Sequence, residues 1–176
     1  MDQEAGYTLP MVLFPLLLNL EEPKIVVRPA LPYAAVRTTA LVQDFPVVLP
    51  KAYRQVVDWL KANGAKPAGP PMVRYRVIDM KKGLQIDIGF PTAKPMKGGV
   101  GVICDALPAG RYVSLYHKGG DIMAANGALQ DWAKKKGLQF KVQGDRWKSR
   151  AELNPVDPGD TPDASKWETE ILIMIR

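Results

Sequence analysis

The spacing of apolar residues divides the chain into short strands and two amphipathic helices. In 72–78 and 84–90, apolar side chains take every second position, which is typical of strands with one buried face. Two longer stretches repeat apolar residues every three or four positions and end at Gly64 and Gly137, so they predict helices. Their buried faces are predicted to be Tyr53, Val56, Val57 and Leu60, and Ile122, Ala125, Leu129, Trp132 and Ala133. The predicted strands are 24–28, 33–42, 72–78, 84–90, 100–104, 111–117, 138–142, 147–153 and 167–175.

The two halves of the chain, about 23–97 and about 98–176, repeat one order of motifs. Each half has a Pro-Ala-x-x-Tyr motif, then an Asp-Trp pair, then the glycine that ends its helix. The motifs are Pro29-Ala30-x-x-Tyr33 with Asp58-Trp59 and Gly64, and Pro108-Ala109-x-x-Tyr112 with Asp131-Trp132 and Gly137. Each half therefore reads strand–helix–strand–strand (βαββ). We expect an α+β fold of duplicated βαββ units, with helices on one side of antiparallel sheets and a cleft between the halves.

The closing strand, 167–175, carries the most informative residue, Glu170. Both faces of this strand contain apolar residues, which predicts an interior strand rather than an edge strand. Glu170 shares a face with Leu172, and a carboxylate in such surroundings is costly without a donor, a cation or water. Two interpretations stay open from the pattern alone. Glu170 either faces a ligand, or it hydrogen-bonds a neighbouring strand and caps a sheet end.

Composition and charge remove several classes of function. The chain has 176 residues, of which 47% are hydrophobic and 24% are charged, as in a single globular domain. The net charge of +6 permits nucleic-acid binding, but the one block of cations, 134–136, follows a predicted helix and suits its dipole. No recognition motif accompanies it, so we expect no sequence-specific DNA binding.

The residues that hold metals, nucleotides and catalytic triads are scarce. Cys104 is the only cysteine and His117 the only histidine, which excludes a disulfide framework and leaves almost nothing for a metal site or a Ser-His-Asp triad. No glycine-rich phosphate-binding motif is present. We therefore expect no cofactor and no metal.

The first residues form an apolar segment outside the predicted domain. Residues 11–20 are strongly apolar but too short to span a bilayer, and they lack the features of a signal peptide. We expect 1–22 to be an extension that packs on the domain, packs on a partner or is partly disordered, and 23–176 to be the domain. We expect no membrane span and a cytoplasmic location.

Several short motifs, spread in order over the domain, resemble the GyrI-like small-molecule-binding family. This family includes the gyrase-inhibitory protein and the effector-binding domains of AraC-type and multidrug-responsive regulators. The matching pieces are Arg28-Pro29-Ala30-x-x-Tyr33, Gly89-Phe90-Pro91, Leu107-Pro108-Ala109-Gly110-Arg111-Tyr112, His117-x-Gly119-Gly120 and Trp167-x-x-Glu170. They cover nearly the whole chain from residue 23 onward. The resemblance implies two βαββ units with pseudo-twofold symmetry and a hydrophobic cleft between them.

The resemblance also implies a ligand site around a buried glutamate. In such domains a glutamate on the final strand faces lipophilic, often cationic ligands, and aromatic residues line the pocket; Glu170 takes that position here. The candidate lining residues are Trp167, Tyr112, Tyr75, Phe90 and Tyr33. Tyr116 is a further candidate, because it shares a strand face with Tyr112. A carboxylate among aromatic rings suits a delocalised cation. One departure is Gly119-Gly120-Asp121, where many members have a tyrosine after a Gly-Pro turn, so one aromatic wall is expected to be missing or replaced by the carboxylate of Asp121.

Three functions remain open at this point. The first is a stand-alone binding domain that senses or sequesters lipophilic small molecules, with cationic ones among the candidates. The second, implied by stand-alone relatives, is a hydrolase of electrophilic cyclopropane compounds, with Glu170 as general base and with Trp167 and Tyr112 positioning the substrate. The third is a protein-interaction role with DNA gyrase. Whether the domain forms a homodimer also stays open.

Overall fold

The structure is a computed structural model, and it describes residues 21–176. The predicted N-terminal extension, 1–22, lies almost wholly outside the described residues. In the described part, no helix has the length and apolar character needed to cross a membrane.

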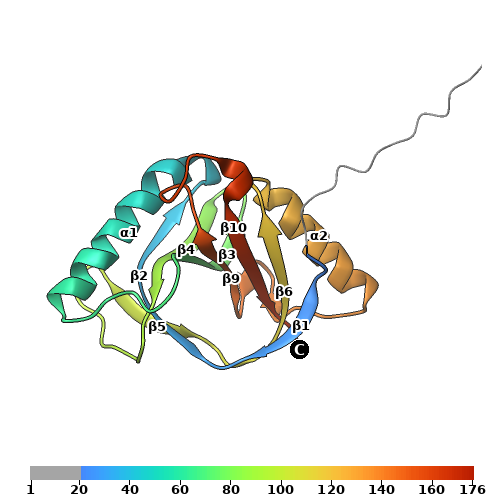
Figure 1. Cartoon of the computed structure of the whole chain (residues 1–176). Coiled ribbons are helices and arrows are strands. Elements are labelled where there is room, and N and C mark those ends of the chain that lie inside the picture. The colour runs from blue at the N-terminus through green and yellow to red at the C-terminus, as the bar shows by residue number, and fades with distance from the viewer. Residues whose placement is uncertain (1–20) are drawn as a thin grey trace, which may run out of the picture.

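The described residues form one ten-stranded antiparallel sheet and two α-helices, with two short 3-10 turns, which confirms the α+β class (Figure 1). The first half contains β1 (Lys24–Arg28), β2 (Leu31–Ala40), η1 (Val42–Asp44), α1 (Phe45–Ala62), β3 (Met72–Asp79) and β4 (Gly83–Pro91). The second half contains β5 (Ile103–Leu107), β6 (Gly110–Lys118), α2 (Ile122–Lys135), β7 (Val142–Gln143), β8 (Arg146–Trp147), β9 (Arg150–Val156), η2 (Ala164–Lys166) and β10 (Glu168–Met174).

The strand order shows the duplication that the motifs predicted. The strands follow the order β1-β6-β10-β9-β3-β4-β2-β5, so the two halves meet at the central β9–β3 pair. Each half also lends its first strand to the other half, because β1 pairs with β6 and β5 pairs with β2. β10 has neighbours on both sides, β6 and β9, and is therefore the interior strand that its apolar faces predicted.

The exchanged strands curl the sheet strongly. Arg28 pairs with Gly110 and Leu31 pairs with Leu107, so the antiparallel register is the same on both sides of the interruption. β1–β2 and β5–β6 thus act as one bent antiparallel pair, interrupted at the two Pro-Ala motifs, where proline removes backbone donors. This pair joins the outer strands of the two halves, and the sheet becomes a curled, half-barrel surface (Figure 1).

The curled sheet has two different faces, which we call the helix face and the inner face. Both helices pack on the helix face, as predicted: α2 covers Ile171 and Ile173 of β10, and α1 covers Ile86 and Ile88 of β4. The inner face buries its own apolar cluster, in which Tyr33, Tyr112, Met72, Leu172 and Met174 take part. Each fully buried aliphatic side chain contributes about 1.5–3 kcal/mol. β10 needs apolar residues on both faces because both faces are covered.

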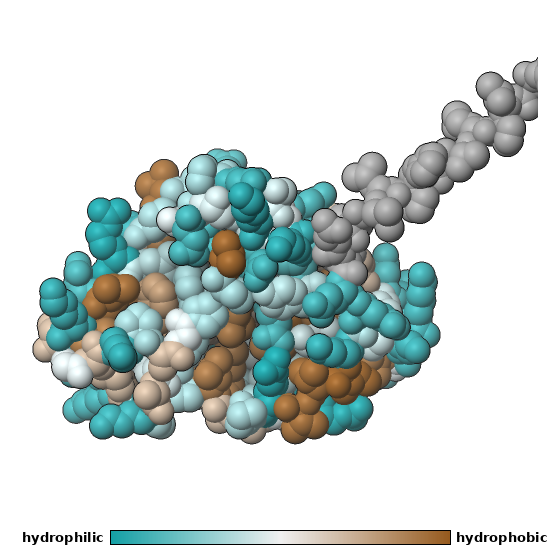
Figure 2. Space-filling model, viewed as in Figure 1, coloured by the Kyte–Doolittle hydropathy of each residue, from teal (hydrophilic) through white to brown (hydrophobic). Residues whose placement is uncertain are grey.

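The surface view agrees with the exposed positions of β1. In Figure 2, apolar patches interrupt a mostly polar surface, and one lies toward the lower right, where Figure 1 shows β1. Val27 of β1 is 77% exposed and Ile25 is 43% exposed. β1 pairs only with β6, so it is an edge strand of the sheet.

Two strand predictions were wrong in position. The strand predicted at 100–104 begins at Ile103, because Gly99 and Val102 close a tight turn (N···O 2.9 Å) in which Gly101 has a φ of +72°. The strand predicted at 138–142 is mostly irregular and leads into the two-residue strands β7 and β8. Other strand ends differ from the prediction by a few residues, the largest shift being at β9.

Candidate functional site

A large cavity lies on the helix face, between the two helices. Its volume is about 1030 Å³, and its walls come from α1, α2, the central strands β3 and β9, and the segment that precedes β10. That segment crosses between the helices at the top of Figure 1. This is the cleft between the halves that the duplication predicted, and its volume is at the upper end of the range for small-molecule pockets.

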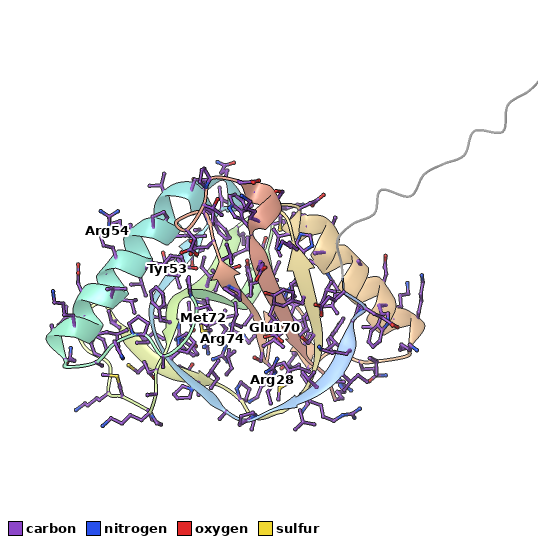
Figure 3. The ribbon with its side chains drawn as sticks, viewed as in Figure 1. Arg28, Tyr53, Arg54, Met72, Arg74 and Glu170 are labelled. Carbon is purple, nitrogen blue, oxygen red and sulfur yellow. The ribbon has the colours of Figure 1, made fainter. Side chains whose placement is uncertain are left out.

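Apolar and aromatic side chains make up most of the cavity wall. They include Phe45, Leu49, Tyr53, Val73, Leu84, Phe90, Ile122 and Trp167. The rings of Tyr53 and Phe90 lie 5.3 Å apart between centroids and are tilted by 58°, a favourable aromatic arrangement. In Figure 3, Tyr53 points from α1 toward the sheet, whereas its neighbour Arg54 points outward. The wall therefore suits a large apolar ligand.

Glu152 of β9 is the buried carboxylate of the cavity wall, which also includes the partly exposed Asp157. The Glu152 side chain lies on the helix face and the residue is 8% exposed. The Tyr75 hydroxyl donates to Oε2 at 2.8 Å, and the Asn126 side-chain amide donates to Oε1 at 2.9 Å. No lysine or arginine of residues 21–176 lies within 4.0 Å of its carboxylate oxygens. Glu152 is thus held by neutral donors and lacks a direct cationic partner within the domain.

Arg150, two residues before Glu152, is the nearest opposing charge. Its guanidinium donates to the side-chain oxygen Oδ1 of Asn126 at 2.8 Å. It also lies over two aromatic rings, at 5.9 Å from the centroid of Tyr75 and 4.8 Å from that of Trp147. Asn126 therefore bridges the acid and the base, accepting from Arg150 and donating to Glu152. The guanidinium of Arg150 is thus stabilised by cation–π contacts and by the Asn126 amide rather than by a salt bridge.

The ionisation of these groups follows from burial. Burial raises the pKa of Glu152, and the hydrogen bonds from Asn126 and Tyr75 and the charge of Arg150 oppose this rise only in part. Burial lowers the pKa of Arg150 and raises the pKa of Tyr75 well above its ordinary value. A cavity that makes a negative charge costly favours any ligand that brings a positive charge to it.

Three of the predicted site residues line this cavity: Tyr75, Phe90 and Trp167. The Trp167 indole N–H donates to the backbone oxygen of Thr161 at 2.8 Å, which fixes its ring beside the segment that covers the cavity. Gly119 and Gly120 also line the wall, while the carboxylate of Asp121 caps α2 by accepting from the amide of Ala124 at 2.9 Å. Asp121 is therefore not a substitute wall for the missing tyrosine.

The other four predicted site residues lie on the inner face: Glu170, Tyr112, Tyr33 and Tyr116. Glu170 accepts from the Ser114 hydroxyl at 2.8 Å and forms a salt bridge with Arg28 (Figure 3). Thr169, the residue before it, faces the cavity, so the alternation of a strand sends Glu170 to the opposite side. Glu170 and Trp167 consequently do not share one site.

The hydroxyls of the three inner-face tyrosines are satisfied within the domain. Tyr33 donates to Asp87 at 2.6 Å, Tyr112 donates to the backbone oxygen of Pro108 at 2.6 Å, and Tyr116 donates to Glu168. The hydrogen bond to Glu168 raises the pKa of Tyr116 to about 12. These contacts link neighbouring strands.

Sequence reasoning missed Glu152, Asn126 and Arg150. The signal for Glu152 was present, because Ala151-Glu152-Leu153 places an acid within an apolar strand just as Glu170-Ile171-Leu172 does. Asn126 stands on the buried side of α2, where an amide needs a partner. Within residues 21–176, no group of three or more His, Cys, Asp or Glu side chains is placed to hold a metal ion.

Solved structures share this fold at low sequence identity. No protein-family model matches the sequence, and no curated protein matches it. EcmrR in an EcmrR–DNA complex aligns with a TM-score of 0.71 and 17% identity, over 88% of this chain and 57% of the EcmrR chain. The EcmrR C-terminal domain gives a TM-score of 0.67 and 16% identity, over 88% of this chain and 97% of that domain.

A third structure was solved with a small molecule. SAV2435 bound to tetraphenylphosphonium aligns with a TM-score of 0.59 and 11% identity, over 89% of this chain and 94% of that chain. This chain thus spans 97% of the EcmrR C-terminal domain but only 57% of the EcmrR chain in the DNA complex. The chain has the GyrI-like fold that its sequence motifs predicted.

Proposed function

We propose that this domain binds lipophilic small molecules that carry a positive charge, in the helix-face cavity and around Glu152. The observation that carries the proposal is a buried carboxylate that has neutral hydrogen-bond donors but no salt bridge to a residue of the described chain. A bound cation supplies the missing counter-charge, and the aromatic wall supplies apolar and cation–π contact. Glu152 thereby takes the role that the sequence motifs suggested for Glu170.

The neighbouring structures support the chemistry of this ligand. SAV2435 was solved with tetraphenylphosphonium, which is a lipophilic cation, and it shares the fold over 94% of its length. Arg150 limits where a cationic ligand can place its charge, because the guanidinium lies behind Asn126 on the same cavity floor. A ligand whose charge sits close to Glu152 and away from Arg150 is favoured over one whose charge is spread along its length.

Binding is better supported than the hydrolysis of cyclopropane compounds. The residues assigned to that reaction, Glu170, Trp167 and Tyr112, do not meet, since Trp167 lines the cavity and the other two lie on the inner face. Their side chains are also occupied by structural hydrogen bonds. The cavity around Glu152 therefore serves as a receptor for the ligand in this proposal.

A titration with charged and neutral probes tests this function. The probes are rhodamine 6G, followed by fluorescence, and tetraphenylphosphonium and neutral triphenylphosphine oxide, followed by calorimetry. We expect Glu152→Gln to weaken binding of both cations at least about tenfold, because a desolvated charge pair is lost. Binding of the neutral probe should change less than about threefold, since its apolar contacts remain.

Glu170→Gln is the matched control, because it makes the same chemical change on the inner face. It should leave all three affinities as they are in the unaltered protein. Unchanged cation binding by a folded Glu152→Gln protein, as judged by circular dichroism, would overturn the proposal. Equal weakening by both substitutions would show a general effect of net charge and would count against it as well.

A further inference from the structure

A second concavity of the domain collects positive charge. It has a volume of about 420 Å³ and lies where the inner-face residues of β3 meet the β7–β8 hairpin and Arg176. Six of the side chains around it are cationic: Arg74, Arg76, Lys141, Arg146, Lys148 and Arg176. No Asp or Glu side chain of the described residues lines it. We call it the basic pocket, and it is separate from the cavity that contains Glu152.

The carboxylates behind the basic pocket do not balance its charge. Arg74 and Arg76 contact Asp105 at 3.2 and 2.9 Å, and Arg76 also contacts Asp87 at 3.2 Å. Asp87 and Asp105 are shared with a third arginine, Arg37, which lies 2.6 Å from Asp87 and 3.7 Å from Asp105. Three guanidinium groups therefore divide two carboxylates, and one positive charge stays uncompensated.

The hairpin adds further charge without partners. Lys141, Arg146 and Lys148 form no salt bridge with any residue of 21–176. Like charges gathered around one concavity repel each other, and an anion bound among them removes that repulsion. The charge balance of the pocket thus favours an anionic ligand.

The backbone holds these cations in place. The amide of Ile78 in β3 donates to Asp145 at 3.0 Å, and the amide of Lys148 donates to Lys141 at 2.8 Å. On the other side, the amide of Lys141 donates to the oxygen of Met174 at 2.9 Å. The hairpin is therefore fixed to both the central and the closing parts of the sheet. Preformed sites lose less entropy on binding than mobile ones.

Arg74 is the most buried of the cations that line the basic pocket. Its side chain is only 8% exposed, its terminal nitrogens donate to Tyr33, Asp105, Ala106 and Lys148, and its Nε is buried without a partner in the described residues. A buried guanidinium nitrogen without an acceptor is unfavourable. Arg74 lines the pocket, so an oxyanion bound there lies beside this buried guanidinium and offsets its charge.

The hairpin side of the pocket has no counterpart in the first half of the duplication. In the first half, a short connection, 63–71, joins α1 to β3 without a strand. In the second half, the equivalent connection from α2 to β9 is longer and contains the β7–β8 hairpin with Lys141, Arg146 and Lys148. These three cations therefore have no equivalents in the first half.

We propose that the basic pocket binds the phosphate group of a small phosphorylated molecule. Guanidinium groups present parallel N–H donors that match phosphate oxygens, and several converging cations suit an anion with more than one charge. The volume exceeds that of phosphate alone and falls within the range for small-molecule sites. Trp147 offers a flat apolar wall for the remainder of the ligand, held by its contacts with Arg150 and Phe140.

Calorimetry on the full chain tests the proposal with inorganic phosphate, pyrophosphate and AMP at low salt. Lys141→Ala/Arg146→Ala/Lys148→Ala removes three exposed hairpin cations and leaves the buried arginines and their acids intact. We expect pyrophosphate binding to weaken at least about tenfold in this variant. Lys134→Ala/Lys135→Ala/Lys136→Ala, with the same charge change at the end of α2, should weaken it less than about twofold.

Nuclear magnetic resonance adds a readout that net charge alone does not move. Pyrophosphate should shift the Nε–H signal of Arg74 and the amides of 141–148, and leave the amides of α1 unmoved. AMP should bind more tightly than phosphate; equal binding would show a site for the free anion and would overturn the assignment to a phosphorylated molecule. Absence of pyrophosphate binding up to about 10 mM would overturn the proposal.

Nucleic acid is the alternative ligand, and the same two triple variants distinguish it from a small phosphate compound. Random duplex DNA that binds more tightly than pyrophosphate, and that both triple variants weaken equally, would show diffuse charge attraction and overturn the proposal. Glu152→Gln should leave pyrophosphate binding unchanged, so this site and the helix-face cavity can fail independently.

Discussion

Two buried carboxylates, on opposite faces of one sheet, have opposite surroundings. Asp87 on the inner face accepts from Arg37 at 2.6 Å, from Tyr33 at 2.6 Å and from Arg76 at 3.2 Å. Glu152 on the helix face accepts from a tyrosine and an amide but from no guanidinium. Both are almost inaccessible, with exposed fractions of 1% for Asp87 and 8% for Glu152.

The difference in hydrogen-bond and ion-pair partners distinguishes an acid that stabilises the fold from an acid that can bind a ligand. Burial alone would raise the pKa of Asp87, but the hydrogen bonds from Arg37 and Tyr33 and the charges of Arg37 and Arg76 bring it below its ordinary value. The same burial raises the pKa of Glu152, whose donors are too weak to reverse it. The charge of Asp87 is neutralised by arginines of neighbouring strands, whereas the charge of Glu152 has no such partner and can pair with a ligand.

Removing the charge at Asp87 should have the largest effect on stability. Asp87→Asn leaves Arg37 and Arg76 with one carboxylate between them, and we expect the free energy of unfolding to fall by roughly 2–4 kcal/mol, the partial exposure of Arg37 limiting the loss. Glu152→Gln should change it by less than about 1 kcal/mol, because the Tyr75 hydroxyl can turn to match the amide. Urea unfolding of both variants at pH 7 measures the difference.

The comparison between the two acids requires that the two substitutions lower the free energy of unfolding by different amounts. Equal losses for Asp87→Asn and Glu152→Gln would mean that Glu152 also stabilises the fold through its charge. Unfolding slopes that match the unaltered protein are needed for the comparison, since a changed slope reports a changed unfolded or native state.

The fold was predictable from the sequence because its signals are local and occur twice. Periodicity placed both helices, and the shared Pro-Ala-x-x-Tyr and Asp-Trp motifs revealed the duplication before any contact was known. The exchange of β1 and β5 between the halves was not predictable. It depends on pairings between residues far apart in the sequence, for which the chain carries no local signal.

The site was half predictable for a related reason. Alternation tells which residues of a strand share a face, but β10 is apolar on both faces, so nothing in its sequence says which face meets the cavity. The register resolves this: Tyr33 pairs with Pro91 and Tyr112 with Met174, which makes Glu170 the counterpart of Asp87. Both belong to the inner face, and Glu152, on the neighbouring strand, faces the cavity.

The two acids should also differ in the sign of their pH dependence. A carboxyl with a raised pKa holds its proton in the folded state, so the unaltered protein should lose stability relative to Glu152→Gln as pH rises from the ordinary glutamate range through the raised pKa. The contribution of Asp87 is present above its ordinary pKa and is lost as pH falls through its lowered pKa.

Urea unfolding across pH, with each variant subtracted from the unaltered protein, isolates each group. The two difference curves should slope in opposite directions, and neither slope should exceed about 1.4 kcal/mol per pH unit. Cation binding should also strengthen as pH rises through the window of Glu152, because the ionised carboxylate is the binding form. A difference curve for Glu152→Gln that rises or stays flat with pH would contradict the assignment.

Glu170→Gln should have the smallest effect on the free energy of unfolding. It also gives the most direct test of the comparison, because Glu170 and Asp87 lie on the same face. Glu170 lies on the inner face like Asp87, but its side chain is 20% exposed and its partner Arg28 is 44% exposed. Water can replace a salt bridge in that position, so we expect the free energy of unfolding to change by less than about 1 kcal/mol at pH 7. Arg28→Gln should give a similar value, and the double variant should show weak coupling between the two residues. A loss as large as that of Asp87→Asn would make Glu170 a second structural acid, whereas loss of cation binding with stability intact would return Glu170 to the ligand site.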